Sequence, residues 1–475
     1  MKHTALSIIT ISTLLAFSAF SQDTIQQGIV AKQFLQAHNE QDFKTMKTLA
    51  GKDMRKFGGI ILRFYSKSNY DDFGELVFDS VEFNFQDSPA QLLISSFSKQ
   101  DTTPLYISLF LTQEHKIDGI GFYEHAVFYP TVDSATTIDD IAHAYIDYED
   151  NTGLCIGIYD RGEKQSYYYG EIKRGSGQKP NDLTRFQMGS ISKVFTALML
   201  SDMMVNHGID PLSYVSDYLS DSMPMLGYKK KPLTLLHLAT HTSGYLHNPT
   251  NIDETSTDSW DNFANYDVNH LMAYLKDYEL ERKPGKQWNY SNGAFGLLGY
   301  IATQFYQKPY KEVLKEKITT PLNMPNTTTI EPTTNVFQPY YNGFETNNLH
   351  FKEALIGAGG IYTTTEDMIR FMEANLHPQN TPLKKVLLAA QKTWVRPRNI
   401  DFDMGLGWWI IDHPFDKKSQ LIGHGGHTVG TNTSLFIDPN RDLGIFVAAN
   451  SDIDVQEVAL LIMEIIINQQ NPNVK

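Results

Sequence analysis

The 475-residue chain contains one cysteine, Cys155, so no internal disulfide stabilises it. It also lacks a phosphate-binding glycine loop and a dinucleotide-binding fingerprint, and no run of basic residues stands out. Its 40 basic and 54 acidic side chains give a net charge of −14 at pH 7. These absences argue against nucleotide cofactors, and they make nucleic acids and anionic membrane surfaces poor candidate partners. We interpret the acidic excess as a feature that favours solubility.

Apolar runs long enough to span a bilayer are absent too, and two shorter ones are informative. The run from Ala5 to Phe17 follows a basic start and precedes small residues that a signal peptidase reads, so we predict a signal peptide at 1–21, cleaved after Ser21. The alternative is an uncleaved anchor, for which the run is short. No cysteine near this site offers a lipid attachment point. An exported chain without disulfides indicates a secreted or periplasmic bacterial protein. The run at 458–467 is interrupted by Glu464 and predicts a buried amphipathic helix.

The length predicts two domains. Residues 29–49 have helical spacing and five strand-like runs follow between residues 59 and 122, a pattern typical of a small α+β domain over 23–128. Its order of elements resembles cystatin-like or nuclear-transport-factor-like folds. It holds no set of residues that suggests a ligand, and we interpret it as an accessory domain. Residues 129–140 are small, polar and poorly periodic, and predict a linker.

A second domain is predicted over 141–471. Strand-like sequence lies at both of its ends, and helix-rich sequence lies between them. One antiparallel sheet assembled from the two ends of the domain is therefore expected, in a mixed α/β (α+β) fold. The predicted strands are 153–160 and 165–171 near the start, and 433–437 and 443–449 near the end.

The strongest chemical signal is Ser190 followed three residues later by Lys193, at the start of an apolar run to about Val205. On a helix, residues three apart lie on the same face. The free N–H groups at the helix start favour negative charge on the serine oxygen. A buried lysine loses basicity through desolvation, so Lys193 can take the serine proton near neutral pH. Ser190 is thus a candidate nucleophile beside its base.

The same four-residue pattern occurs at Ser96 and Lys99, which shows that it is weak alone. Residues 91–98 have the β-branched and aromatic content of a strand. Residues three apart on a strand point to opposite faces, so this pair cannot act together. We discard it.

Tyr290 and Asn292 lie in a loop before an apolar helical run at 294–302. A tyrosine hydroxyl beside a lysine can relay a proton to a leaving group, and an asparagine amide can hold a substrate carbonyl. If Ser190 were absent, the simpler explanation would be that Tyr290 packs in the loop and that Asn292 forms a turn. A second Tyr-x-Asn match, at 340–342, shows that this motif is also weak by itself.

The glycine-rich segment 423–430 contains His424, Gly425, Gly426 and His427. Glycines let a substrate backbone approach a strand edge closely, as in binding by strand addition. The N–H of His427, together with that of Ser190, is a candidate oxyanion hole. The alternative is a glycine-rich turn.

His237 and His241 have zinc-ligand spacing, but no glutamate follows His237 and no third ligand is evident. We expect no metal and no cofactor. The glycine of His241-Thr242-Ser243-Gly244 more simply ends a helix.

Taken together and in this order, the motifs resemble the serine β-lactamase and penicillin-binding-protein superfamily, closest to its class C β-lactamase, D-Ala-D-Ala carboxypeptidase and esterase branch. The resemblance covers roughly residues 140–470. It rests on Phe186–Lys193, Gly208–Leu212, Thr234–Gly244, Tyr290–Asn292, Gly357–Thr363, Gly405–Trp408 and His424–Gly426.

The resemblance implies an antiparallel sheet beside an all-helical lobe, with the site between them. It implies Ser190 as the acylated nucleophile, Lys193 and Tyr290 as the proton-transfer pair, Asn292 as the positioning amide and His424-Gly425-Gly426 as the third motif. Which member of the pair is the acylation base stays open, because the two titrate together.

Class C β-lactamases carry lysine where this chain has His424. We expect His424 to be cationic only part of the time near neutral pH. This makes β-lactam hydrolysis the less expected activity and favours peptidase, esterase or amidase activity. The substrate is expected to be a small molecule or peptide with a carbonyl group. The alternative is a non-catalytic sensor that binds cell-wall peptides or penicillin. A third reading places the main activity in the N-terminal domain. The sequence leaves the oligomeric state open.

Overall fold

The computed structural model describes residues 136–470, apart from 149–150, 221–222, 253–260, 262, 281 and 342, together with four strands between 76 and 123 and parts of 30–49. The chain divides into two compact units, 1–131 and 132–475. Each unit is treated separately. The predicted signal peptide, the strand expected at 59–65 and most of the linker lie outside the described residues.

The first unit contains the antiparallel meander that the sequence predicts. Its four strands pair in chain order. Ser96 belongs to the second of them, so the discarded serine–lysine match does lie on a strand. The strands are β1 (Leu76–Asn84), β2 (Ala90–Ser98), β3 (Pro104–Leu111) and β4 (Ile117–Tyr123).

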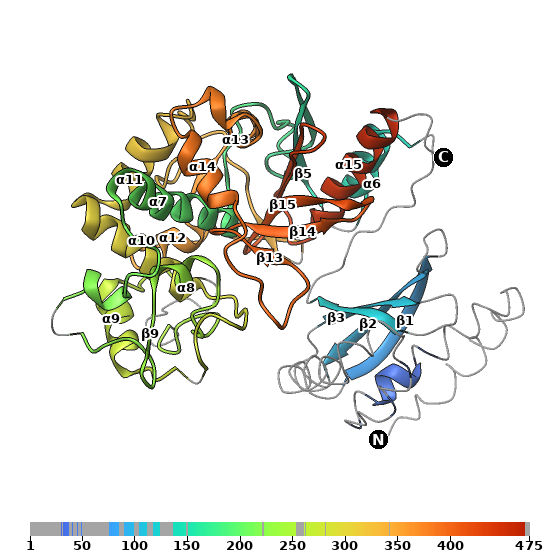
Figure 1. The fold of residues 1–475 in the computed structure, drawn as a ribbon. Helices are drawn as coiled ribbons and strands as arrows, with labels where there is room; N and C mark the ends of the chain where they lie inside the picture. Colours follow the sequence, from blue (N-terminus) through green and yellow to red (C-terminus); the bar gives the residue numbers. More distant parts are fainter. Residues whose placement is uncertain are drawn as a thin grey trace, which may run out of the picture. The chain divides into compact units, whose positions relative to one another are not determined.

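The second unit is built on a seven-stranded antiparallel sheet in the order β13-β14-β15-β16-β17-β5-β6 (Figure 1). As predicted, its two chain ends meet in this sheet, where β5 pairs with β17. The β5–β6 hairpin turns at Arg161 and Gly162, which both have positive φ. The strands are β5 (Gly153–Asp160), β6 (Glu163–Gly170), β13 (Asp403–Met404), β14 (Trp409–His413), β15 (Asp416–Thr428), β16 (Thr431–Asp438) and β17 (Leu443–Ala449).

Helices cover both faces of this sheet, which explains why every residue of β16 and β17 is buried. One face carries α13 (Thr365–Leu376), whose side chains lie against Gly157 of β5 and Gly444 of β17. The other carries α15 (Gln456–Gln470), the predicted amphipathic helix, which packs beside α6 (Ile138–Ile146). None of the helices in the described residues is long and apolar enough to cross a membrane.

The helical lobe is organised around α7 (Ser192–His207), whose first twelve residues are all buried. A helix that is buried on every side must be the centre of its lobe. Figure 1 shows most of the lobe's other helices beside it, whereas the helix at Val268–Asp277 packs against the one at Asn292–Tyr306. These other helices are α8 (Leu235–Ala239), α9 (Val268–Asp277), α10 (Asn292–Tyr306), α11 (Tyr310–Leu314), α12 (Ile356–Gly359) and α14 (Lys384–Gln391). The sheet and this lobe confirm the predicted fold class.

Two boundaries differ from the expectation. Helix α6 begins at Ile138, inside the expected linker, because Thr137 and Asp140 form a reciprocal capping box. Ser190 lies not in α7 itself but in a 3₁₀ turn, Gly189–Ile191, that leads directly into it. Both corrections concern helix starts, where local capping decides the first helical residue.

Candidate active site

Ser190 lies in a turn that is pressed against the backbone of β15. Gly189 has a φ of 51°, and a Cβ there would lie 2.7 Å from the His427 nitrogen. Only glycine fits this combination of conformation and contact. Ser190 itself is partly exposed although the residues on either side are buried. The serine hydroxyl is therefore held at a fixed place and stays accessible.

Lys193 is fully buried and its amine reaches the serine. Its Nζ lies 2.9 Å from Ser190 Oγ and 2.7 Å from the carbonyl oxygen of Ala358. Burial holds the pKa of Lys193 well below its usual range. The predicted serine–lysine contact is thus present, with an amine that readily becomes neutral.

The Gly357–Thr363 segment holds the serine turn and α7 in place. In the sequence it is only one of the motifs that carry the family resemblance. The Gly357 carbonyl accepts a hydrogen bond from Thr196 Oγ1 at 2.6 Å. The Ile361 N–H donates to Ser192 Oγ at 3.2 Å, and its carbonyl accepts from the Met188 N–H at 2.9 Å. Ser190 and Lys193 are consequently braced by this segment as well as by β15.

Tyr290 completes a three-residue cluster. Its hydroxyl lies near enough to the Ser190 side chain for that side chain to influence its pKa, and its ring centroid lies 4.7 Å from Lys193 Nζ. Burial raises the pKa of Tyr290, and the nearby Ser190 side chain opposes part of that rise. Tyr290 is therefore a neutral phenol at ordinary pH, able to pass a proton but not to remain a phenolate.

His241 supports Tyr290, a contact that the sequence reading missed. The two rings stack with centroids 4.2 Å apart. The Ser291 N–H donates to His241 Nδ1 at 3.0 Å, which places the imidazole proton on Nε2. Burial, followed by the charge of Lys193, lowers the pKa of His241 well below its usual value. A neutral ring thus fixes the face of Tyr290 and the backbone that follows it.

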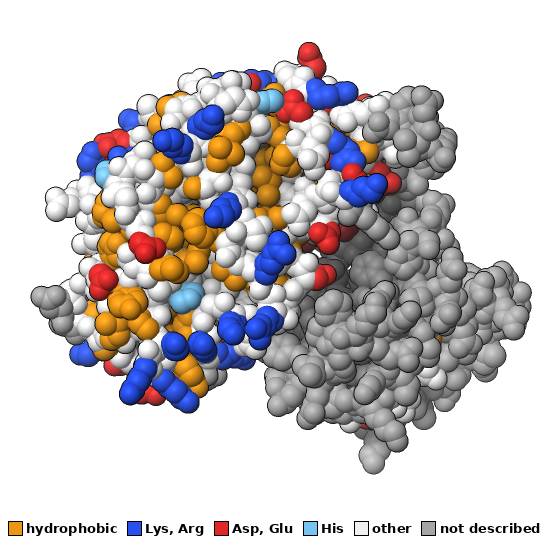
Figure 2. All heavy atoms as spheres, viewed as in Figure 1, with side chains coloured by type: hydrophobic (Ala, Val, Ile, Leu, Met, Phe, Trp, Pro, Cys, Tyr) orange, Lys and Arg blue, Asp and Glu red, His pale blue; other side chains and the backbone are white. Residues whose placement is uncertain are grey.

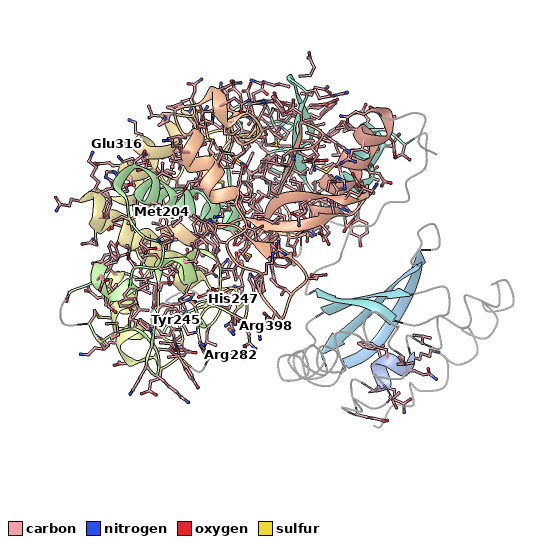
Figure 3. All side chains as sticks on the ribbon, viewed as in Figure 1. Met204, Tyr245, His247, Arg282, Glu316 and Arg398 are labelled. Atoms are coloured by element: carbon pink, nitrogen blue, oxygen red, sulfur yellow. The ribbon has the colours of Figure 1, made fainter. Side chains whose placement is uncertain are left out.

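Asn292 is the first residue of α10, not a loop residue as predicted. Its backbone N–H donates to the His247 carbonyl at 2.7 Å, and its Nδ2 donates to Asn248 Oδ1 at 2.8 Å. Its Oδ1 accepts no hydrogen bond from the described residues. The loop that carries His247 and Asn248 therefore orients the Asn292 amide, and Figure 3 shows His247 on that loop.

His424 is buried in β15 and stacks on Trp409, with ring centroids 4.3 Å apart. Burial, reinforced by the charge of Lys193, lowers the pKa of His424 to about 3. The expectation of partial protonation near neutral pH is thus wrong, because desolvation of the ring was not visible in the sequence. His424 is neutral, and its Nε2 has no hydrogen-bond partner among the described residues.

Most of the glycine-rich segment, residues 423–428, belongs to strand β15, and residues 429–430 form the turn that follows it. Strand β14 pairs with β15 only as far as Gly423, so residues 424–428 have a strand neighbour, β16, on one side alone within the described region. Gly426 touches the turn that carries the serine: a Cβ there would lie 2.1 Å from the Met188 carbonyl oxygen. His427 is exposed at this edge.

The two histidines with zinc-ligand spacing are both engaged by the backbone. His237 Nδ1 accepts from the Thr234 N–H at 3.1 Å, where it closes the capping box of α8. His241 Nδ1 accepts from Ser291, as described above. No group of three or more His, Cys, Asp or Glu side chains in the described residues has the arrangement of a metal site.

Comparisons with known proteins place this geometry in a family. Residues 138–467 match the family model described as Beta-lactamase. A beta-lactamase of Yersinia enterocolitica is 27% identical over 300 residues, which cover 61% of this chain and 73% of that protein. The D-alanyl-D-alanine-carboxypeptidase/endopeptidase AmpH of Escherichia coli K12 is 26% identical over 331 residues, covering 65% of this chain and 83% of that protein.

Solved structures agree on the fold. The class C beta lactamase from Rhodobacter sphaeroides superposes with a TM-score of 0.60 at 21% identity, covering 70% of this chain and 99% of that one. A beta-lactamase/D-alanine carboxypeptidase from Yersinia pestis gives 0.58 at 22% identity, covering 71% and 97%. The chain therefore belongs to the β-lactamase family and is a serine hydrolase of that family, acting on carbonyl substrates.

Proposed function

We propose that the protein hydrolyses esters or amides through an acyl-enzyme on Ser190, with Lys193 and Tyr290 as its proton-transfer pair. The observation that carries the proposal is the 2.9 Å contact between Lys193 Nζ and Ser190 Oγ, made by an amine whose pKa burial depresses. A neutral amine at hydrogen-bond distance accepts the hydroxyl proton as the serine attacks the carbonyl carbon.

The remaining steps follow from the neighbouring groups. The negative oxygen of the tetrahedral intermediate is stabilised by the N–H groups of Ser190 and His427, whose backbones the Gly189 contact holds together. When the intermediate collapses, the bond to the leaving group breaks and Tyr290 delivers a proton to that group, while Lys193 returns one to Tyr290. Water then attacks the acyl-enzyme by the same route and frees Ser190.

For the substrate class, the neutral His424 is the informative residue. A histidine with a pKa of about 3 provides no cation for a substrate carboxylate at neutral pH. We therefore favour esters and amides over β-lactams, whereas D-alanyl peptides remain a substrate suggested by the name of the AmpH relative. An extended substrate lies along the edge of β15 at 424–428 that β14 does not cover, where Gly425 and Gly426 leave room for its backbone. The side-chain amide of Asn292 holds the amide group of this substrate.

We also propose that the mature protein is secreted or periplasmic, after removal of residues 1–21. The apolar run and the small residues before the cleavage position support this. Residues 23–128 are proposed as an accessory domain, joined by the linker segment to the hydrolase domain that ends near 471.

The test is to incubate the protein with p-nitrophenyl acetate and to map the acetyl group by peptide mass spectrometry. We expect an adduct on Ser190, a burst of p-nitrophenol followed by steady turnover, and neither in Ser190→Ala. A Ser96→Ala control should behave like the wild type. An adduct without turnover would favour the non-catalytic sensor, and undiminished turnover by Ser190→Ala would remove the proposal.

A further inference from the structure

His241 ends helix α8 in a backbone conformation that glycine usually supplies. Its φ is 54°, in the left-handed region. The Thr242 N–H donates to the His237 carbonyl at 3.0 Å, the bond that closes a helix end of this kind around a left-handed residue. The sequence predicted that Gly244 ends this helix, but the chain turns three residues earlier, at a residue with a side chain. Such a conformation is unfavourable for any residue with a Cβ.

This one residue holds three consecutive positions of the segment that carries Tyr290. The Asn289 N–H donates to the His241 carbonyl at 2.7 Å. The imidazole stacks on the Tyr290 ring at 4.2 Å, with the two planes 24° apart. The Ser291 N–H donates to His241 Nδ1 at 3.0 Å. The backbone before Tyr290, its ring and the backbone after it are therefore all fixed by His241.

No other ring neighbour constrains Tyr290 as closely. The remaining contacts of its ring within the described chain have larger centroid distances and tilted planes. They are His247 at 5.3 Å and 58°, Trp288 at 5.8 Å and 55°, and His424 at 6.4 Å and 50°. Helix α8, which leads into His241, also packs against α10, which follows Tyr290. The position of the phenol thus depends mainly on His241.

Histidine at this position has two unfavourable features. One is the left-handed backbone. The other is the Nε2 atom, which carries the imidazole proton, is buried and has no hydrogen-bond partner among the described residues. Glycine would remove the first, and an apolar ring would remove the second. Neither replacement could both accept the Ser291 N–H and stack on Tyr290, so local stability alone does not explain the histidine.

We propose that His241 is the positioning residue of Tyr290 and holds the phenol hydroxyl where the departing group takes its proton. The inference rests on the proposed function, in which Tyr290 delivers that proton. In this step the bond between the acyl carbon and the leaving oxygen breaks, the oxygen takes the Tyr290 proton, and Lys193 returns one to Tyr290. His241 gains and loses no proton. Its contribution is geometric, because proton transfer weakens steeply when donor and acceptor are misplaced.

The experiment compares two acetate esters that give the same acetyl-enzyme. Trifluoroethyl acetate needs a proton on its leaving group, and p-nitrophenyl acetate does not. His241→Asn removes the ring but keeps an oxygen acceptor near the Nδ1 position, in a residue that tolerates the left-handed backbone. We expect kcat/KM to fall about 10-fold or more for the trifluoroethyl ester and about 3-fold or less for the p-nitrophenyl ester. Equal losses for the two esters would overturn the proposal.

Gln307→Asn is the matched control. Gln307 also follows a helix with a left-handed backbone, its φ being 53°, and it lies at the end of α10 away from Tyr290. Neither ester should be affected. A second test variant, His241→Phe, keeps a ring and removes the acceptor for Ser291. It should show the same difference between the esters, and it decides the matter if circular dichroism shows that His241→Asn does not fold. Equal losses in folded His241→Phe would likewise overturn the proposal.

A double variant separates this inference from the proposed function. In a Tyr290→Phe background no hydroxyl is left to position, so adding His241→Asn should lower kcat/KM for the trifluoroethyl ester by less than about 2-fold. A full further loss of about 10-fold would show that His241 acts other than through Tyr290 and would refute the inference. An unchanged rate for that ester in Tyr290→Phe alone would instead refute proton delivery by Tyr290.

Discussion

The Lys193 amine lies within hydrogen-bond distance of both the Ser190 hydroxyl and the Ala358 carbonyl, in a position with no exposed surface. A neutral amine has two protons and one lone pair. Donation to the Ala358 carbonyl uses one proton and leaves the other proton and the lone pair, and a turn about the Cε–Nζ bond can present the lone pair to Ser190. The carbonyl from α12 therefore orients the base, and burial makes it neutral.

Replacing Lys193 with methionine removes the amine and keeps most of the side-chain volume. We expect kcat/KM for ester hydrolysis to fall by about 10²–10⁴-fold, the usual contribution of a positioned base. The free energy of unfolding should stay the same or rise, because an apolar chain needs no desolvation. Steady-state kinetics and urea unfolding measure the two effects. Lys384→Met, at an exposed position of α14, should leave activity as it is; wild-type activity in Lys193→Met would exclude the lysine as base.

Replacing Tyr290 with phenylalanine removes the hydroxyl and keeps the ring that stacks on His241 and lies 4.7 Å from Lys193 Nζ. A poor leaving group such as trifluoroethoxide needs a proton, whereas p-nitrophenolate does not. We thus expect kcat/KM to fall about 10²-fold or more for trifluoroethyl acetate and by much less for p-nitrophenyl acetate. Losses of the same size for the two esters would mean that Tyr290 acts elsewhere in the reaction.

The pH dependence of kcat/KM should show one ascending limb. Activity rises with pH as the buried Lys193, whose pKa is lowered, loses its proton, and it then stays level because burial raises the pKa of Tyr290. His424, with a pKa of about 3, should contribute no inflection between pH 5 and 8. The rate profile of His424→Gln checks this. A limb near pH 6.5 that disappears in this variant would show that His424 titrates in the free enzyme.

His424 should also make the fold less stable in acid. Its pKa is about 3 when folded and near 6.5 when unfolded, so between these values the unfolded chain binds more protons. The free energy of unfolding therefore falls as the pH is lowered from 6.5, by at most about 1.4 kcal/mol per pH unit for this one group. Urea unfolding of His424→Gln should show a shallower decline over this window. Parallel declines in the two proteins would contradict the prediction.

Two adjacent glycines of β15 should differ sharply in their tolerance of alanine. A Cβ at Gly426 would lie 2.1 Å from the Met188 carbonyl oxygen, so Gly426→Ala must push the strand away from the serine turn and separate the two oxyanion donors. We expect kcat to fall by about 10²-fold or more. In Gly425→Ala the new Cβ makes ordinary contacts, with the Trp409 ring at 3.6 Å and the Thr433 carbonyl oxygen at 3.9 Å, and the change should cost less than about 10-fold. Initial rates with p-nitrophenyl acetate decide; similar losses would refute the proposed role of this contact.

The exposed basic side chains of the hydrolase unit are not evenly distributed over its surface. Figure 2 shows Lys and Arg side chains gathered on the lower part of the face in view, over the region of β9 (Lys231–Pro232) and Arg282. The chain as a whole carries a net charge of −14. Local cationic surface therefore coexists with an acidic protein, a distribution that net charge alone does not reveal.

The sequence by itself determined the features that depend on near neighbours. Ser190 and Lys193 are three residues apart, and any helix-like turn brings them together. The hairpins, the burial of α7 and the β-strand context of Ser96 also follow from local pattern, which is why they could be predicted. The same local signals included the Thr137–Asp140 capping box, although the linker reading overlooked it.

Only the tertiary structure decided the electrostatics and the walls of the site. His241 and Tyr290 are far apart in sequence, as are Trp288 and Phe402, and nothing in either segment encodes their ring contacts. The neutral state of His424 likewise depends on how many groups from other segments exclude water from it. Desolvation and aromatic packing depend on all the residues that surround a side chain in space. Those residues come from distant parts of the sequence and meet only in the folded chain.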